Sequence, residues 1–129
     1  MPYFSIIIPV YNRPDEVNDL LESLSKQTYK DFEVIIVEDG STVCCADAVK
    51  RYASIVDIHY YYKENEGRSI ARNYGLERAV GSYFIFFDSD CVIPEGYFEA
   101  LNAVLNRHYT DCFGGPLLLT IRSVTFRRQ

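Results

Sequence analysis

The chain lacks the features that mark several large classes of protein. Its 129 residues contain no apolar run that approaches the roughly 20 residues of a membrane-spanning helix. The formal net charge is −5, so there is no basic surface to neutralise phosphates, and we expect no nucleic-acid partner. The cysteines show no CxxC spacing and the two histidines are isolated, which disfavours a zinc site.

The cysteine pattern and the start of the chain bear on location. Cys44 and Cys45 are adjacent, a poor geometry for bridging each other, and we expect the cysteines to be reduced. No basic segment precedes the first strand-like run, so the sequence predicts no signal peptide. We therefore expect a cytoplasmic protein, at the cytoplasmic membrane face if the full-length protein is associated with a membrane.

The composition is that of one folded domain, with 48 % hydrophobic and 24 % charged residues. Strand-like runs cover residues 3–9, 31–37, 55–62 and 84–87. Helical spacing begins at Pro14, covers 43–53 and 68–80, and begins again at Pro94. This alternation predicts βαβ units, and hence an α/β fold with a mostly parallel, Rossmann-like sheet flanked by helices. The tail, 111–129, predicts one or two further strands of uncertain pairing.

The most informative segment is the apolar strand at 84–87, which ends on Asp88, Ser89 and Asp90. A wholly apolar run indicates a central strand that is buried on both faces. Unpaired carboxylates are costly to bury, so both acids are expected where the strand leaves the core. They offer hard oxygen ligands to a divalent cation, which can in turn hold a phosphate.

Polar groups follow the other predicted strands as well, at 11–13, 38–39 and 64–68. In an open parallel sheet, ligands bind outside the carboxyl ends of the strands, so these groups should meet at one edge. Together they supply an aromatic ring, an acid, cations at a helix start and an acid pair. A nucleoside diphosphate needs this inventory.

Each group also has a simpler interpretation when it is taken alone. Tyr11 could be a wall residue, and Ser41 could cap the following helix after a turn at Asp39. Arg68 and Arg72 could form a solvated helix face that pairs with acids at 64 and 66. The acids after residue 87 could be loop residues without a metal. Their conjunction favours the functional interpretation.

Six short motifs occur in order over about the first hundred residues. They are SIIIPVYN (5–12), QT (27–28), FEVIIVEDGST (32–42), NEG (65–67), ARN (71–73) and FFDSD (86–90). Each is weak alone, but the ordered set resembles the N-terminal part of a family 2 glycosyltransferase with the GT-A fold. The resemblance implies a single nucleotide-sugar-binding domain over residues 1–129, as part of a longer enzyme.

The resemblance also implies roles for named residues. Asp90 would be the metal ligand through which Mn²⁺ or Mg²⁺ holds the diphosphate. Asp39 would accept a hydrogen bond from the base, Asp88 would face the ribose, and the nucleotide site would comprise Pro9, Tyr11, Asp39, Arg72 and Asp88. The implied activity is inverting transfer from a nucleotide-sugar donor, with UDP as the commonest nucleotide. The acceptor, a glycan, a lipid or another hydroxyl, stays unknown, and the implied process is glycan or cell-envelope polysaccharide synthesis.

The chain departs from the family pattern in two respects. Glu38 stands where the family often has a second Asp. In the family the catalytic base lies well beyond the Asp-x-Asp motif, usually in an acidic pair, and a Gln-x-x-Arg-Trp segment often follows, but this chain has no Trp. The acids after Asp90 are Glu95, Glu99 and Asp111, and none stands at the usual position of the base. We therefore expect a truncated chain without its base, whose exposed apolar surface favours self-association.

Two alternatives compete with this interpretation. The motif from Asp88 to Val92 also resembles haloacid dehalogenase-type phosphatases, with Asp88 as nucleophile and Asp90 as acid/base. In that family the motif follows the first strand and needs a later lysine, whereas no lysine follows Asp90 here. The other alternative is a nucleotide-binding fragment with no turnover. A dinucleotide-binding dehydrogenase is disfavoured because the first loop has no G-x-G-x-x-G.

Overall fold

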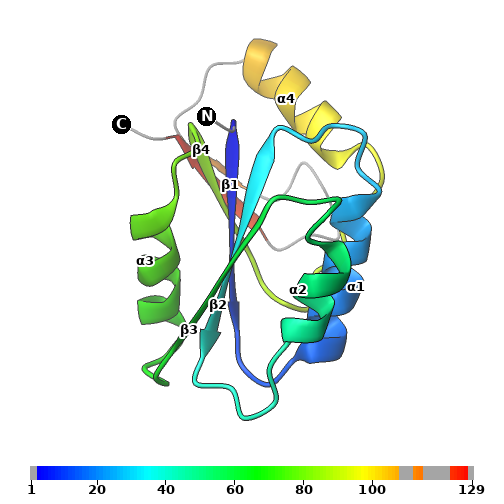
Figure 1. Cartoon of the computed structure of the whole chain (residues 1–129). Helices are drawn as coiled ribbons and strands as arrows, with labels where there is room; N and C mark the ends of the chain where they lie inside the picture. Colours follow the sequence, from blue (N-terminus) through cyan, green and yellow to red (C-terminus); the bar gives the residue numbers. More distant parts are fainter. Residues whose placement is uncertain (1–2, 108–111, 115–122, 128–129) are drawn as a thin grey trace.

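A six-stranded sheet with the order β3-β2-β1-β4-β6-β5 forms the centre of the computed structural model (Figure 1). The structure describes residues 3–107, 112–114 and 123–127. The first four strands are parallel, as predicted, and the last two are antiparallel to their neighbours. The strands are β1 (Phe4–Val10), β2 (Phe32–Asp39), β3 (Ile58–Lys63), β4 (Tyr83–Phe87), β5 (Cys112–Gly114) and β6 (Ser123–Arg127).

The helices cover both faces of the sheet (Figure 1). They are α1 (Pro14–Ser25), α2 (Ala46–Tyr52), α3 (Arg68–Arg78) and α4 (Tyr97–Arg107). Every residue of β1 and β2 is buried, which explains why these strands read as continuous apolar runs. Successive side chains of β1 point to opposite faces of the sheet and belong to two hydrophobic cores. Ile6 and Ile8 pack with α1, α2 and α4 on one face, while Ile7 packs with α3 on the other.

Several boundaries differ from the predicted ones for local reasons. Strand β2 continues through Asp39, because Asp39 pairs with Lys63 of β3. Helix α2 begins at Ala46, because the N–H groups of Val43 and Cys45 before it donate to the side chains of Asn12 and Glu38. Helix α4 begins three residues after Pro94, behind a turn in which Gly96 has a φ of 76°. Helix α3 starts where it was predicted.

The chain order reverses beside β1. Strands β2 and β3 follow on one side of β1, and β4 then pairs with its other side. Parallel sheets open a crevice at such a reversal, outside the carboxyl ends of the two strands. Of the one or two strands predicted in the tail, the structure describes two: β6 pairs with β4 and β5 pairs with β6, while Asp111 lies outside the described residues.

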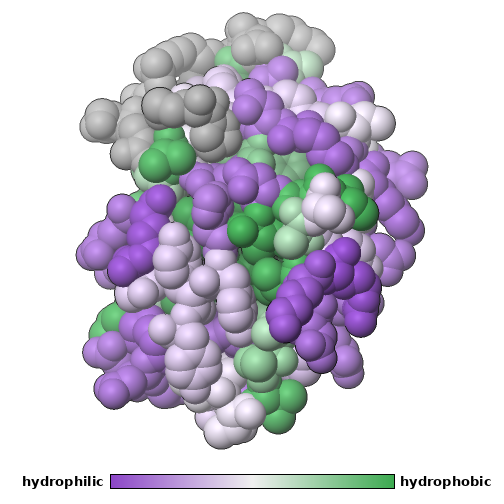
Figure 2. All heavy atoms as spheres, in the orientation of Figure 1, coloured by the Kyte–Doolittle hydropathy of each residue, from purple (hydrophilic) through white to green (hydrophobic). Residues whose placement is uncertain are grey.

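The edge of the sheet at β3 faces the viewer in Figures 1 and 2, where apolar side chains are exposed between strongly polar surfaces. Ile55 and Tyr62 are 53 % and 56 % exposed in this part of the chain.

Within the described residues, no helix has both the length and the apolar character to cross a membrane.

Candidate functional site

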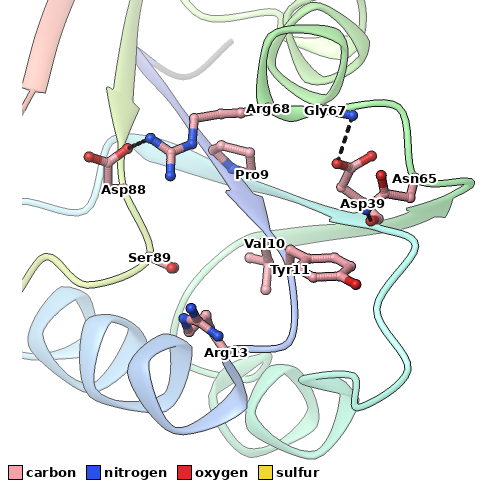
Figure 3. A pocket seen from close by; sticks show the side chains of 10 residues that line it. All are labelled: Pro9, Val10, Tyr11, Arg13, Asp39, Asn65, Gly67, Arg68, Asp88 and Ser89. Carbon is pink, nitrogen blue, oxygen red and sulfur yellow. Dashed lines mark hydrogen bonds and ion pairs between the residues drawn. The ribbon is translucent and has the colours of Figure 1, made fainter.

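A pocket of about 290 Å³ lies at the strand reversal, at the carboxyl ends of β1, β2 and β4. In Figure 3, Tyr11, Asp39 and Asn65 lie on one side and Asp88 and Ser89 on the other. The polar segments that the sequence places at the strand ends therefore do meet at one edge. The lining residues are Pro9, Val10, Tyr11, Arg13, Asp39, Asn65, Gly67, Arg68, Asp88 and Ser89.

Asp88 forms an ion cluster with two arginines from the first turns of α3. Its Oδ1 lies 3.2 Å from Nη2 of Arg72 and 3.7 Å from Nη1 of Arg68, which extends across the pocket (Figure 3). The alternative in which these arginines pair with the acids at 64 and 66 is therefore wrong. Nε of Arg72 is buried and has no hydrogen-bond partner within the described residues.

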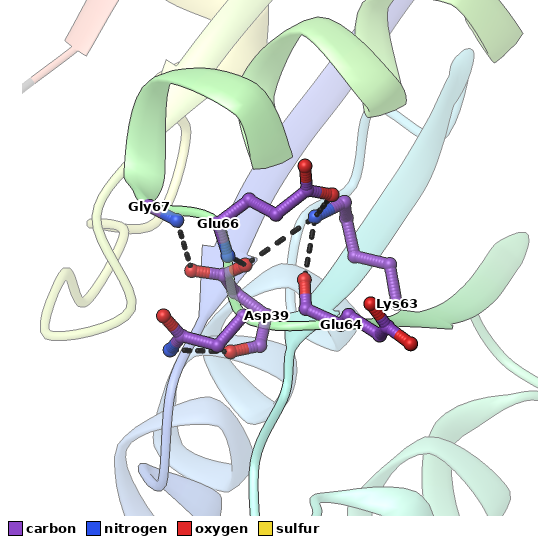
Figure 4. Close-up of polar contacts among 6 residues, drawn as sticks. Asp39, Lys63, Glu64, Glu66 and Gly67 are labelled. Carbon is purple, nitrogen blue, oxygen red and sulfur yellow. Dashed lines mark hydrogen bonds and ion pairs between the residues drawn. The ribbon is translucent and has the colours of Figure 1, made fainter.

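Asp39 is buried, 5 % exposed, and its carboxylate holds the loop before α3. Its oxygens accept hydrogen bonds from the N–H groups of Glu66 at 2.9 Å and Gly67 at 3.0 Å (Figure 4). Nζ of Lys63 lies 3.6 Å from Oδ1 of Asp39 and 2.7 Å from Glu66. The hydrogen bond to Glu66 raises the pKa of Lys63, so the ammonium stays charged beside both acids.

Gly40 allows the ends of β2 and β3 to approach each other. It has a φ of 74°, and a Cβ at this position would lie 2.6 Å from the backbone nitrogen of Asn65. The amide of Asn65 donates to the carbonyl of Asp39 at 3.0 Å. A side chain at residue 40 would therefore displace one wall of the pocket.

Tyr11 is 50 % exposed and presents its ring to the pocket, whereas Pro9 is buried at the end of β1. Arg13 reaches the pocket from the loop after β1, and its Nε lies 3.4 Å from Glu16. The same carboxylate oxygen accepts a hydrogen bond from the Ser89 hydroxyl at 3.3 Å. Glu16 thus links Arg13, in the loop after β1, to the segment that carries the two aspartates.

Four of the predicted nucleotide-site residues line the pocket: Pro9, Tyr11, Asp39 and Asp88. The fifth, Arg72, does not line it but pairs with Asp88. Asp90 does not line it; its side chain is exposed and forms no bond or ion pair with any other described residue. The pocket also contains Arg13, Asn65 and Arg68, which the predicted nucleotide site does not include. All three belong to the polar segments at the strand ends, which was the available signal.

The carboxylates of Asp88 and Asp90 suit a divalent cation that takes only some of its ligands from the protein. The described residues contain no cluster of three or more acidic, histidine or cysteine side chains able to hold a metal. Asp88 and Asp90 supply carboxylate oxygens, which are the ligands of Mg²⁺ and Mn²⁺. Such ions commonly take one or two protein carboxylates and complete their shell with phosphate and water, so these residues fit that role.

A parallel α/β sheet with a polar pocket at its strand reversal, where a ring and an acid face an acid–arginine cluster, has the place and the lining of a ligand-binding site in the α/β class. Residues 5–129 match the family model Glycosyl transferase family 2, and the chain belongs to this family. The prediction of this family and of its GT-A fold is confirmed. The phosphatase alternative does not fit, because its aspartate motif follows the first strand, whereas Asp88 and Asp90 follow the fourth.

The relatives and solved structures agree with this assignment. The chain is 44 % identical over 90 residues to an uncharacterized glycosyltransferase of Rickettsia felis, covering 67 % of this chain and 14 % of the relative. It is 43 % identical to the putative teichuronic acid biosynthesis glycosyltransferase TuaG of Bacillus subtilis, covering 69 % and 36 %.

The crystal structure of S. aureus TarS 1-349 in complex with UDP-GlcNAc superimposes with a TM-score of 0.81 at 32 % identity, over 87 % of this chain and 33 % of that one. The chain thus spans well under half the length of each of these three proteins.

Proposed function

We propose that the chain is the donor-binding domain of a glycosyltransferase that takes its sugar from a nucleotide-sugar, with UDP as the nucleotide. The observation that carries this proposal is the pocket itself. The ring of Tyr11 and the carboxylate of Asp39 share it with Asp88 and its two arginines. The UDP-GlcNAc bound by TarS supports a UDP-sugar, and the name of TuaG supports a role in cell-envelope polysaccharide synthesis.

The proposed roles follow the two halves of the pocket. Pro9 and Tyr11 border the base, and Asp39 accepts a hydrogen bond from it through lone pairs that the backbone N–H groups leave open. Asp88 faces the ribose, and Arg72 holds Asp88 in place. Asp90, which is exposed and directly follows the pocket residue Ser89, would hold Mn²⁺ or Mg²⁺.

A divalent cation bound there would neutralise charge on the leaving nucleoside diphosphate. The protein side chains position the donor for attack by an acceptor hydroxyl. Inverting transfer also needs a carboxylate base within hydrogen-bond reach of that hydroxyl. The acids that line the pocket are Asp39 and Asp88, and both are already engaged by donors. We therefore propose that the base comes from outside the described residues.

The test is calorimetric titration with UDP, with and without Mn²⁺. We expect saturable binding that Mn²⁺ strengthens. Asp90→Ala should lose about tenfold in affinity, or about 1.4 kcal/mol, only when Mn²⁺ is present. Glu95→Ala is the matched control, because Glu95 is an exposed acid that lines a different groove. A folded wild-type chain that binds no UDP at millimolar concentration would contradict the proposal.

A further inference from the structure

Glu38 is a fully buried carboxylate at the end of β2, directly before Asp39. Its oxygens accept hydrogen bonds from the Ser41 hydroxyl at 2.6 Å, the Cys45 N–H at 2.6 Å and the Tyr60 hydroxyl at 2.7 Å. Burial and the hydrogen bond to Glu38 raise the pKa of Tyr60, so the phenol stays protonated and donates. Three donors, two from the loop after β2 and one from β3, thus fix this carboxylate.

Ser41 passes this restraint to the loop after β1. Because its hydroxyl donates to Glu38, its oxygen accepts the N–H of Asn12, at 2.9 Å. The side chain of Asn12 returns the contact, since its Oδ1 accepts the N–H groups of Thr42 at 2.8 Å and Val43 at 3.0 Å. The loops after β1 and β2 are therefore joined in both directions.

The backbone at Asn12 has the geometry that this junction requires. Asn12 has a φ of 51°, in the left-handed region that Asn and Gly tolerate best. This turn brings the Asn12 side chain onto the neighbouring loop directly after Tyr11. At the other end of the junction, Asp39 follows Glu38. Tyr11 and Asp39, two of the residues proposed to contact the base, thus each adjoin a member of the same hydrogen-bonded unit.

We infer that Glu38, Ser41 and Asn12 form a clamp that sets the position of Tyr11 relative to Asp39 and thereby controls recognition of the nucleotide base. These are positioning residues, since none of the three lines the pocket. The inference rests on the proposed function. The inference also implies that Asp cannot replace Glu38 in this chain. The Asp side chain is one methylene shorter, so its carboxylate would lie about 1.5 Å farther back and could not accept hydrogen bonds from all three donors.

The test separates the base half of the pocket from the phosphate half. UDP engages both halves, whereas inorganic pyrophosphate engages only the phosphate half, and each is titrated in the presence of Mn²⁺. Asn12→Gly removes the clamp side chain and keeps a residue that tolerates the positive φ. We expect UDP affinity to fall about tenfold and pyrophosphate affinity to stay within about twofold of wild type.

Two further variants complete the experiment. Asn12→Asp keeps the oxygen that accepts the N–H groups of Thr42 and Val43 and should restore UDP affinity. Glu38→Asp changes the buried carboxylate of the clamp and should likewise lower the affinity for UDP but not for pyrophosphate. This variant decides the test if Asn12→Gly does not fold. Unchanged UDP affinity, or a parallel fall for UDP and pyrophosphate, would overturn the clamp. Failure of the proposed function is recognised separately, because the wild-type chain itself would then not bind UDP.

Discussion

At the scale of single residues, the three acids of β2 are each buried, and each is held by donors from a different part of the chain. Glu33, near the start of the strand, accepts the Ser5 hydroxyl at 2.5 Å and the Val80 N–H at 2.8 Å. Glu38 and Asp39, at its end, hold loops of the pocket. Buried carboxylates need such partners, so each acid stabilises one connection.

Tyr29 is expected to make the stability of the fold decrease at alkaline pH. Burial, followed by the nearby Asp31, raises the pKa of its phenol from 10.0 to about 12. Folding therefore favours the protonated phenol. This contribution to stability is complete below the unfolded value near 10 and is lost as the pH rises through about 12. We expect the midpoint of urea unfolding to fall over this interval, and to fall less in Tyr29→Phe.

The Tyr29→Phe comparison isolates one hydroxyl. The ring, which packs 5.8 Å from that of Phe4, is retained, so the core contact is kept. Tyr60, whose pKa is also raised, contributes in the same direction in both proteins and cancels in the difference. The same decline with pH in wild type and variant would show that Tyr29 does not carry the effect.

At the scale of elements, the contact of α3 with the sheet depends on Gly75. The sequence marks this residue as one that weakens the helix, by about 1 kcal/mol relative to Ala. In the structure, an added Cβ would lie 2.8 Å from Cγ2 of Ile7 and 3.3 Å from Cγ2 of Val37. Both are fully buried β-branched side chains of the central strands and cannot turn away. Glycine thus allows the helix to approach the sheet.

We expect Gly75→Ala to destabilise the chain by about 1–3 kcal/mol, because overpacking outweighs the gain in helix propensity. The measurement is the free energy of unfolding in urea. Asn73→Ala, at an exposed position of the same helix, is the control and should be neutral or slightly stabilising. A gain in stability for Gly75→Ala would mean that α3 can shift away from the sheet at little cost.

Periodicity was enough to predict the alternating elements and the parallel centre of the sheet. It failed where long-range hydrogen bonds decide a boundary, as before the start of α2, where the Val43 N–H donates to Asn12. It also left the tail unpaired. The pairing of β6 with β4 joins segments about forty positions apart in the sequence, and nothing in the local pattern of residues 111–129 specifies the partner.

At the scale of the whole molecule, the predicted convergence of strand ends holds, but the direction of each side chain did not follow from it. Asp88 and Asp90 are two residues apart, yet Asp88 pairs with the arginines of α3 while Asp90 is exposed and does not line the pocket. A strand ending fixes where the backbone leaves the sheet. Ion pairs and turns beyond that point, which involve distant residues, decide which carboxylate faces the pocket.

The same geometry predicts how the chain behaves as an enzyme. Asp39 and Asp88 are held by donors, so the pocket as described has no carboxylate available to deprotonate an acceptor. We expect the 129-residue chain to bind a UDP-sugar and to release UDP no faster than a chain with Asp88→Asn, whereas a longer polypeptide that adds the relatives' further sequence should release it. The measurement is UDP formed from UDP-GlcNAc over time. Turnover by this chain alone, abolished by Asp88→Asn, would place the base within these residues.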